Sequence, residues 1–232
     1  LRDIVISKLA DPDAFVRRAA AGTLRRHAAS ENIGPLLKLW SATPAEDTQL
    51  IHTVRMALRD NLRNSNVFAM ATRNIGDRPE EMARLSDVCL GLPNKQSARF
   101  LFGFIRNEGA KSPRMTAYLR HATRYLAADS LSNLFTHALT FRNTGGSVER
   151  RVLRAMYGGL QERGAQPPPE MAAWGLSTAR KLIESNEEPE VFVGIELAWD
   201  LKLAGLGGEL AKLADKSSPQ PALRTFAIDA LA

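Results

Sequence analysis

Four prolines recur at nearly constant spacing along the first half of this chain of 232 residues. Pro12, Pro44, Pro79 and Pro113 are 32, 35 and 34 residues apart. Each precedes a stretch in which apolar residues recur every three or four positions, which is the pattern of an amphipathic helix, and proline is favoured in the first helical turn. A period of this length accommodates one pair of antiparallel helices. The sequence therefore predicts an array of helix pairs.

The segment 11–26 shows the repeating unit in most detail. Asp11 is expected to cap a helix that begins at Pro12, because an aspartate side chain accepts hydrogen bonds from the free N–H groups of a first turn. Val16, Ala20 and Leu24 then recur every four residues and form one apolar stripe.

The offsets of this unit return at the other end of the chain. Arg, Ala and Leu stand five, eight and twelve residues after a proline in both places: Arg17, Ala20 and Leu24 follow Pro12, and Arg224, Ala227 and Leu231 follow Pro219. The unit resembles the HEAT repeat. This resemblance implies an all-α fold, a right-handed α-α superhelix of about six to seven antiparallel helix pairs.

We expect a single HEAT-like repeat domain over residues 1–232. The repeats are more regular over 1–143 and irregular over 144–188, and the pattern resumes over 189–232. The chain begins at Leu1 without an initiator Met and ends at Ala232 within a helical pattern, which predicts a fragment of a larger protein.

The repeat pattern gives positional expectations for helix starts and for the core. Six prolines should lie at or near helix starts: Pro12, Pro44, Pro79, Pro113, Pro189 and Pro219. Eight apolar side chains should be buried: Val16, Ala20, Leu24, Leu101, Leu119, Leu126, Leu153 and Leu197. Gly164 should end a helix that starts near Val148.

The chain is basic, with a formal net charge of +6, and 23 of its 31 basic residues are arginine. An excess of arginine is typical of phosphate recognition. A genome rich in G and C gives the same excess without any function, and we favour that explanation.

No cofactor is expected in this chain. Cys89 is the only cysteine, so no cysteine-based zinc site and no CxxCH haem motif occurs, and its apolar neighbours predict a buried thiol. The four histidines include no pair at the i, i+4 spacing of a helical zinc site, so no metal site is expected. No apolar run reaches the roughly 18 residues that a membrane span needs.

Arg17 and Arg224 occupy the same repeat position. In HEAT-like arrays such an arginine commonly reaches an aspartate of an adjacent repeat, and Asp13 lies close in sequence. We therefore expect Asp13, Arg17 and Arg224 to belong to a structural ladder. Arg17 should bond an acidic side chain or a helix-end carbonyl, and its loss should cost about 1–3 kcal/mol. The further arginines on the same helix, Arg18, Arg25 and Arg26, are interpreted as a solvated face.

The candidate binding residues are five aromatic and basic side chains at helical spacing: Tyr118, Arg120, His121, Arg124 and Tyr125. Such a surface could stack a base or sugar and hold a phosphate. The alternative, which we favour, is that Tyr118 and His121 pack between repeats with their polar tips hydrogen-bonded.

No catalytic residues are assigned, because the chain lacks the GxSxG, HExxH and Walker A motifs. One enzymatic alternative remains open. Helical-repeat DNA glycosylases are of similar size, are basic, and use Trp and Asp on a concave face, for which Trp174, Trp199 and Asp200 are candidates. This likeness concerns architecture alone.

A more specific resemblance rests on three segments, 118–125 (YLRHATRY), 159–165 (GLQERGA) and 173–175 (AWG). Their order and spacing resemble the helical-repeat segment of large exported bacterial proteins of the heme-binding "membrane-bound dehydrogenase" type, over roughly Arg78 to Ile183. In that family a sugar-dehydrogenase-like β-propeller usually precedes the repeats and a cytochrome c domain follows. The resemblance implies a periplasmic or extracellular location. It assigns no redox activity to these residues, because this chain contains neither of those domains.

The sequence thus predicts a non-catalytic scaffold or interaction module of a larger exported protein. Its partners would be proteins or neighbouring domains of the parent chain, without membrane insertion, and the chain itself would be monomeric. The alternative is a nucleic-acid-binding module, with a DNA glycosylase as its enzymatic form. Because acidic residues are interleaved with the arginines, only weak, non-specific binding to nucleic acid is expected.

Overall fold

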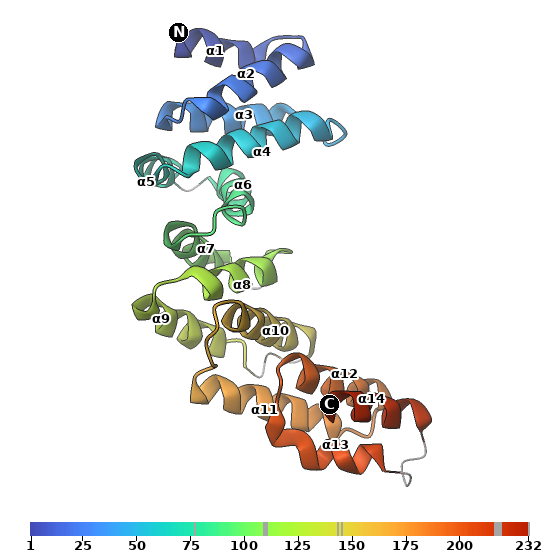
Figure 1. Ribbon diagram of the computed structural model, residues 1–232. Helices are drawn as coiled ribbons and strands as arrows, with labels where there is room; N and C mark the ends of the chain where they lie inside the picture. The colour runs from blue at the N-terminus through green and yellow to red at the C-terminus, as the bar shows by residue number, and fades with distance from the viewer. Residues whose placement is uncertain (77, 109–110, 143, 145, 216–219, 232) are drawn as a thin grey trace. The chain divides into compact units, whose positions relative to one another are not determined.

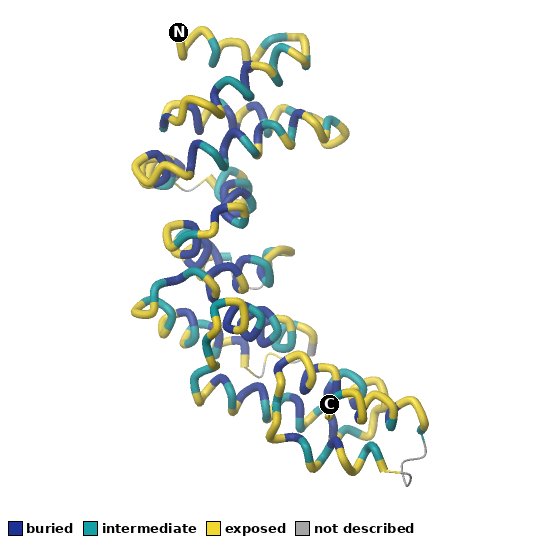
Figure 2. Tube along the Cα trace, viewed as in Figure 1, coloured by how far each residue is buried: buried dark blue, intermediate teal, exposed yellow. Residues whose placement is uncertain are grey.

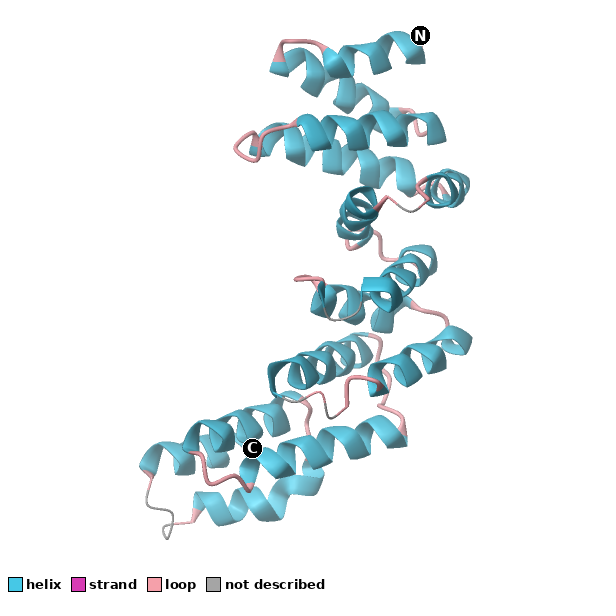
Figure 3. Cartoon of the chain, turned by 180° about the vertical axis from the view of Figure 1, so that it is seen from behind, coloured by secondary structure: helices cyan, strands magenta, loops and turns pink. Residues whose placement is uncertain are grey.

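The computed structural model describes residues 1–76, 78–108, 111–142, 144, 146–215 and 220–231. All regular elements among these residues are helices, and no strand occurs there (Figure 3). The predicted all-α class is confirmed. The chain divides into two compact units, residues 1–109 and 110–232, which are described separately below.

Unit 1 contains seven labelled α-helices (Figure 1). In chain order they are α1 (Arg2–Ser7), α2 (Ala14–Arg26), α3 (Ile33–Ala42), α4 (Thr48–Leu62), α5 (Ser65–Asn74), α6 (Pro79–Cys89) and α7 (Lys95–Glu108). Helices adjacent in sequence pack together, as α3 does with α4 and α6 with α7. Alternate helices also pack together, α2 with α4, α4 with α6 and α5 with α7. Helix α4 thus packs against four others, α2, α3, α5 and α6.

Unit 2 contains the other seven labelled helices. They are α8 (Met115–Tyr125), α9 (Ala128–Leu139), α10 (Gly146–Glu162), α11 (Pro169–Ile183), α12 (Glu188–Asp200), α13 (Gly207–Ala214) and α14 (Pro221–Leu231). Alternate helices again pack in succession, α8 with α10, α10 with α12 and α12 with α14. Gly159 makes the first of these contacts possible, because a Cβ there would lie 2.6 Å from the carbonyl oxygen of Arg120.

Buried side chains recur along the helices of both units (Figure 2). Seven of the eight predicted core residues are buried: Ala20, Leu24, Leu101, Leu119, Leu126, Leu153 and Leu197. The prediction for Val16 is wrong, because this side chain is only half-buried. Val16 lies in the first turn of α2, beside α1, and α1 itself has no buried residue. The cover over that turn is therefore thin.

The expected positions of the prolines are confirmed where the structure describes them. Pro79 and Pro189 lie in the first turns of α6 and α12, and Pro12, Pro44 and Pro113 precede α2, α4 and α8 by two to four residues. Pro219 lies outside the described residues.

The expected cap of α2 is wrong by two residues. Asp13, not Asp11, accepts a hydrogen bond from the backbone N–H of Phe15, at 2.7 Å, and the helix begins at Ala14. The reason is that Asp13 still has the extended backbone of an N-cap, with φ −79° and ψ 124°, so Pro12 cannot be the first helical residue.

Two helices of unit 2 end in the same type of turn. After α10, the N–H of Ala165 donates to the carbonyl of Leu160, and Gly164 has a positive φ of 69°, as the sequence predicted for a terminating glycine. After α12, the N–H of Leu203 donates to the carbonyl of Ala198, but the residue with positive φ is Lys202, at 53°. A lysine therefore occupies a position that normally favours glycine.

Candidate functional site

The five candidate binding residues of α8 divide between the interior and the surface. Tyr118 and His121 are buried, with 3% and 8% of their surface exposed. The favoured interpretation predicted packed side chains at these two positions, and at this level of burial neither residue presents an open ring to a ligand.

The two arginines of this cluster lie at the surface and share one carboxylate. Arg120 Nε lies 2.9 Å from Glu162 Oε1, and Arg124 Nη1 lies 3.2 Å from Glu162 Oε2. The guanidinium of Arg124 also lies 4.9 Å from the centre of the Tyr125 ring, which in turn contacts His121 at a centroid distance of 4.7 Å. These contacts join α8 to α10 and use much of the hydrogen-bonding capacity that a ligand would need.

Two of the expected ladder residues, Arg17 and Asp13, bond backbone groups near them in sequence. Arg17 Nη1 donates to the carbonyl oxygens of Asp11 and Pro12, at 2.8 and 2.9 Å, so this side chain fixes the loop before α2. Asp13 acts as the cap of α2. Arg224 is half-buried in α14.

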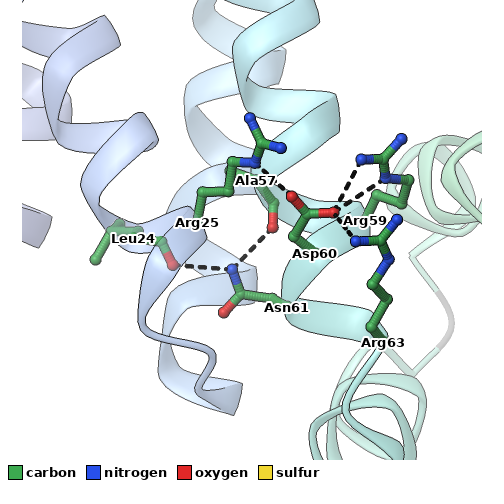
Figure 4. Close-up of polar contacts among 7 residues, drawn as sticks. All are labelled: Leu24, Arg25, Ala57, Arg59, Asp60, Asn61 and Arg63. Carbon is green, nitrogen blue, oxygen red and sulfur yellow. Dashed lines mark hydrogen bonds and ion pairs between the residues drawn. The ribbon is translucent and has the colours of Figure 1, made fainter.

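A different set of residues joins α2 to α4, and sequence reasoning missed it. The carboxylate of Asp60, in α4, contacts three guanidinium groups (Figure 4). Arg25 reaches it from α2 through Nε, whereas Arg59 and Arg63 approach from the other side, with nitrogen–oxygen distances of 3.0 and 3.2 Å. Three positive charges around one carboxylate leave a local surplus of positive charge.

The arginines keep Asp60 ionised. Burial by itself would raise the pKa of this carboxyl group, because a charged group loses hydration inside a protein. The hydrogen bonds and the positive charges of Arg25 and Arg59 outweigh burial, and the pKa of Asp60 lies below its usual value. The ion-paired form is therefore the form present at neutral pH.

The next residue of α4, Asn61, is fully buried and points to the interior. Its Oδ1 accepts hydrogen bonds from the backbone N–H of Ala29 and from Asn32 Nδ2, both at 2.9 Å. Its Nδ2 donates to the carbonyl oxygens of Leu24 and Ala57, at 3.1 and 2.8 Å (Figure 4 shows these last two). Asn61 thus ties the end of α2 and the following turn to α4.

A groove of about 630 Å³ lies beside Asp60, between α2 and α4. Its lining comes from both helices: Gly22, Arg25 and Arg26 from α2, and His52, Thr53, Met56 and Asp60 from α4. Arg25, Arg26 and His52 are exposed. Within the described part of the chain, Arg26 has no ion pair and no side-chain hydrogen bond. The groove therefore presents cationic donors to an incoming anion.

Sequence signals for this groove existed but were local. Asp60 stands between Arg59 and Arg63 in the sequence, at the end of α4, which already indicates a carboxylate with arginines on both sides. Arg25 and Arg26 are exposed, as expected for a solvated face. The pairing of Arg25 with Asp60 could not be recognised, because the two residues are 35 positions apart.

The residues named for the DNA glycosylase alternative are not alike in their surroundings. Trp174 is fully buried, and its Nε1 donates to Glu149 Oε1 at 2.5 Å, so its ring cannot stack on a base. Trp199 is 51% exposed. Asp200 forms an ion pair of 2.7 Å with Arg154. The structure thus brings Trp199 and Asp200 to the surface but not Trp174.

Other potentially reactive groups in the described residues are few. Cys89 is buried as predicted, and burial raises the pKa of its thiol. Burial likewise raises the pKa of Tyr157 to about 12. Among the described residues, no three His, Cys, Asp or Glu side chains gather in a way that could hold a metal ion. None of the described helices has both the length and the apolar character needed to cross a bilayer.

No protein-family model and no curated protein matches this chain.

Proposed function

We propose that this chain is a non-catalytic helical-repeat interaction module, and that the groove between α2 and α4 binds an acidic polypeptide segment. The packing of alternate helices within each unit supports the HEAT-like part of this proposal. Stacked helix pairs expose extended surfaces that suit the docking of peptides and domains.

The observation that carries the proposal is the surplus of positive charge at the groove. Arg25 and Arg26 line the groove from α2, with Asp60 as the one carboxylate among the described lining residues. Arg59 and Arg63 offset the charge of Asp60 from outside the lining, so the charges of Arg25 and Arg26 are not cancelled. Asp60 orients Arg25 through Nε and leaves the two terminal nitrogens of that guanidinium directed elsewhere. Arginines held in this way are suited to bind carboxylates, because the planar fork is already positioned.

The remaining ion pairs favour a polypeptide over nucleic acid. In unit 2, Glu162 compensates Arg120 and Arg124, and Glu209 compensates Arg180. Arg154 lies 2.8 Å from Glu196 and 2.7 Å from Asp200, as ion pairs without aligned hydrogen bonds. Tight duplex binding needs several phosphate contacts along a continuous basic surface. The basic surface of the groove is short, since Arg25 and Arg26 are the only arginines among the described residues that line it, and it therefore fits a short acidic segment.

A binding titration tests the proposal. Fluorescence anisotropy is measured with a labelled peptide of ten glutamates and with a labelled DNA duplex, each at low and at physiological salt. We expect the peptide to bind and the Arg25→Ala, Arg26→Ala double variant to lose most of that binding. Arg99→Ala, an exposed arginine of α7 outside the groove, serves as the matched control.

Two results would reject the proposal. If the glutamate peptide does not bind, or if the double variant binds it as well as the control does, the groove is not the site. We expect a duplex Kd no tighter than about 10⁻⁶ M at physiological salt. Sub-micromolar duplex binding that survives salt, or release of a base from alkylated DNA, would favour the nucleic-acid alternative.

The wider setting of the module rests on sequence resemblance alone. From it we propose that the module acts as a monomeric scaffold within a larger exported protein, in the periplasm or outside the cell, and that neighbouring domains are among its partners. Expression of the parent gene with detection of the protein in cell fractions tests this setting.

A further inference from the structure

Gly22 lies in the interior of α2 without any packing reason for a glycine. A Cβ built there meets no atom within 4 Å, so alanine would fit, and glycine is less favourable than alanine in a helix. The glycines of unit 2 at helix contacts differ, since a Cβ at Gly194 would lie 2.8 Å from the backbone nitrogen of Ile183. What distinguishes Gly22 is its position, because it lines the groove.

Gly22 leaves space on the surface of α2 beside the two exposed arginines, Arg25 and Arg26. Arg25 and Arg26 follow Gly22 by three and four residues, so all three lie on neighbouring parts of one helix face. The missing side chain leaves a gap on the helix surface next to two guanidinium groups. A bulky anionic group can therefore approach α2 closely there, with His52 on the opposite wall.

The charge of the groove matches a dianion better than a carboxylate. Arg25, Arg26 and Asp60 carry the charge of the lining. Arg59 and Arg63, outside the lining, offset the carboxylate of Asp60, so the two guanidinium groups of Arg25 and Arg26 are left for one ligand. A glutamate brings one negative charge and two oxygens. A phosphorylated serine brings a charge of roughly −1.5 to −2 and three acceptor oxygens, which two guanidinium groups can bind together.

We propose that the groove binds a phosphorylated serine side chain within the acidic partner segment, with Arg25 and Arg26 as its donors and Gly22 as the gap that admits it. This proposal rests on the proposed function, and it names the side chain that the groove selects.

The test compares three labelled peptides that differ at one central position, which is phosphoserine, glutamate or serine, within the same acidic flanks. Anisotropy titrations use the wild-type chain and the variants Arg26→Ala and Gly22→Leu. The controls are Arg99→Ala and Gly103→Leu, because Gly103 is also a helical glycine whose Cβ would meet nothing within 4 Å but does not line the groove. Circular dichroism verifies that each variant is folded.

We expect the phosphoserine peptide to bind at least about tenfold more tightly than the glutamate peptide, as charged hydrogen bonds of ordinary strength would give. Arg26→Ala and Gly22→Leu should remove that advantage, whereas both controls should retain it. Inorganic phosphate should compete with the phosphoserine peptide.

Each failure has a separate meaning. Equal binding of the phosphoserine and glutamate peptides would overturn this inference and leave the proposed function standing. Absence of binding by both would overturn the proposed function as well. If Gly22→Leu keeps the full preference for phosphoserine, the gap at Gly22 is not the binding position and the inference is wrong.

Discussion

Replacement of Asn61 by alanine should destabilise unit 1 severely. The variant would remove four hydrogen bonds inside a site from which water is excluded. The backbone N–H of Ala29 would lose its acceptor, at a cost of about 1–3 kcal/mol. Asn32 keeps its bond to the carbonyl of His27, and the carbonyl of Ala57 belongs to α4, so these groups lose less. With the volume left by the shorter side chain, we expect a total of about 3–4 kcal/mol.

Urea denaturation followed by circular dichroism measures this loss. Asn66→Ala is the matched control, because Asn66 is exposed on α5, and the expected change is within about 0.5 kcal/mol. Hydrogen exchange supplies a second measurement, since the amide of Ala29 should exchange much faster in Asn61→Ala. A loss below about 1 kcal/mol together with unchanged exchange at Ala29 would refute the reasoning.

Four further predictions concern single side chains. Arg17→Ala should cost about 1–3 kcal/mol in urea denaturation, because two backbone carbonyls lose a charged donor; an unchanged midpoint would contradict a structural role. Gly159→Ala should destabilise the chain by about 1–3 kcal/mol, because the added methyl group would overlap α8, whereas Gly103→Ala should stabilise it by about 0.5–1 kcal/mol. Lys202→Gly should raise the free energy of unfolding by roughly 1 kcal/mol, because the positive φ costs lysine more than glycine; a lower melting temperature would speak against this. The pKa of Asp60 is lowered in the folded chain, so its ion pairs stabilise the fold above the unfolded pKa of about 3.9. This contribution is lost as the pH falls through the pKa of the folded state. The variant Asp60→Asn should therefore lose less stability than the wild type between about pH 5 and pH 3.

The helices could be predicted from the sequence because their signals are local. The proline period and the apolar stripes depend on residues within one or two helical turns, and the structure bears out the helices that they predict. The boundary of α2 was missed because Asp11 and Asp13 are both able to cap a helix, and only the backbone conformation of Asp13 decides between them. The partial exposure of Val16 was missed for another reason, since burial depends on neighbouring helices that a single stripe does not specify.

The groove could not be predicted because its two walls are distant in sequence. Arg25 and Asp60 are 35 residues apart, and their contact requires the register between α2 and α4. The same limit applies in unit 2. The sequence offered Arg120 and Arg124 as candidate binding residues, and their common partner Glu162 lies on another helix, 42 and 38 residues further along the chain. A one-helix pattern identifies which charges share a face, but not which charges oppose them.

Asp60 and Asn61 are consecutive residues of α4, and both hold α2 and the turn after it against α4. Asp60 does so at the surface and Asn61 in the interior. Arg25 reaches Asp60 and the backbone of Ala29 reaches Asn61, so any local opening that separates α2 from α4 breaks both. A ligand that bridges the walls of the groove favours the closed state, and the opening becomes rarer by the factor 1 + [L]/Kd. Occupancy of the groove is thereby linked thermodynamically to the cohesion of the helix stack beneath it. A partner segment would stiffen unit 1 as it binds.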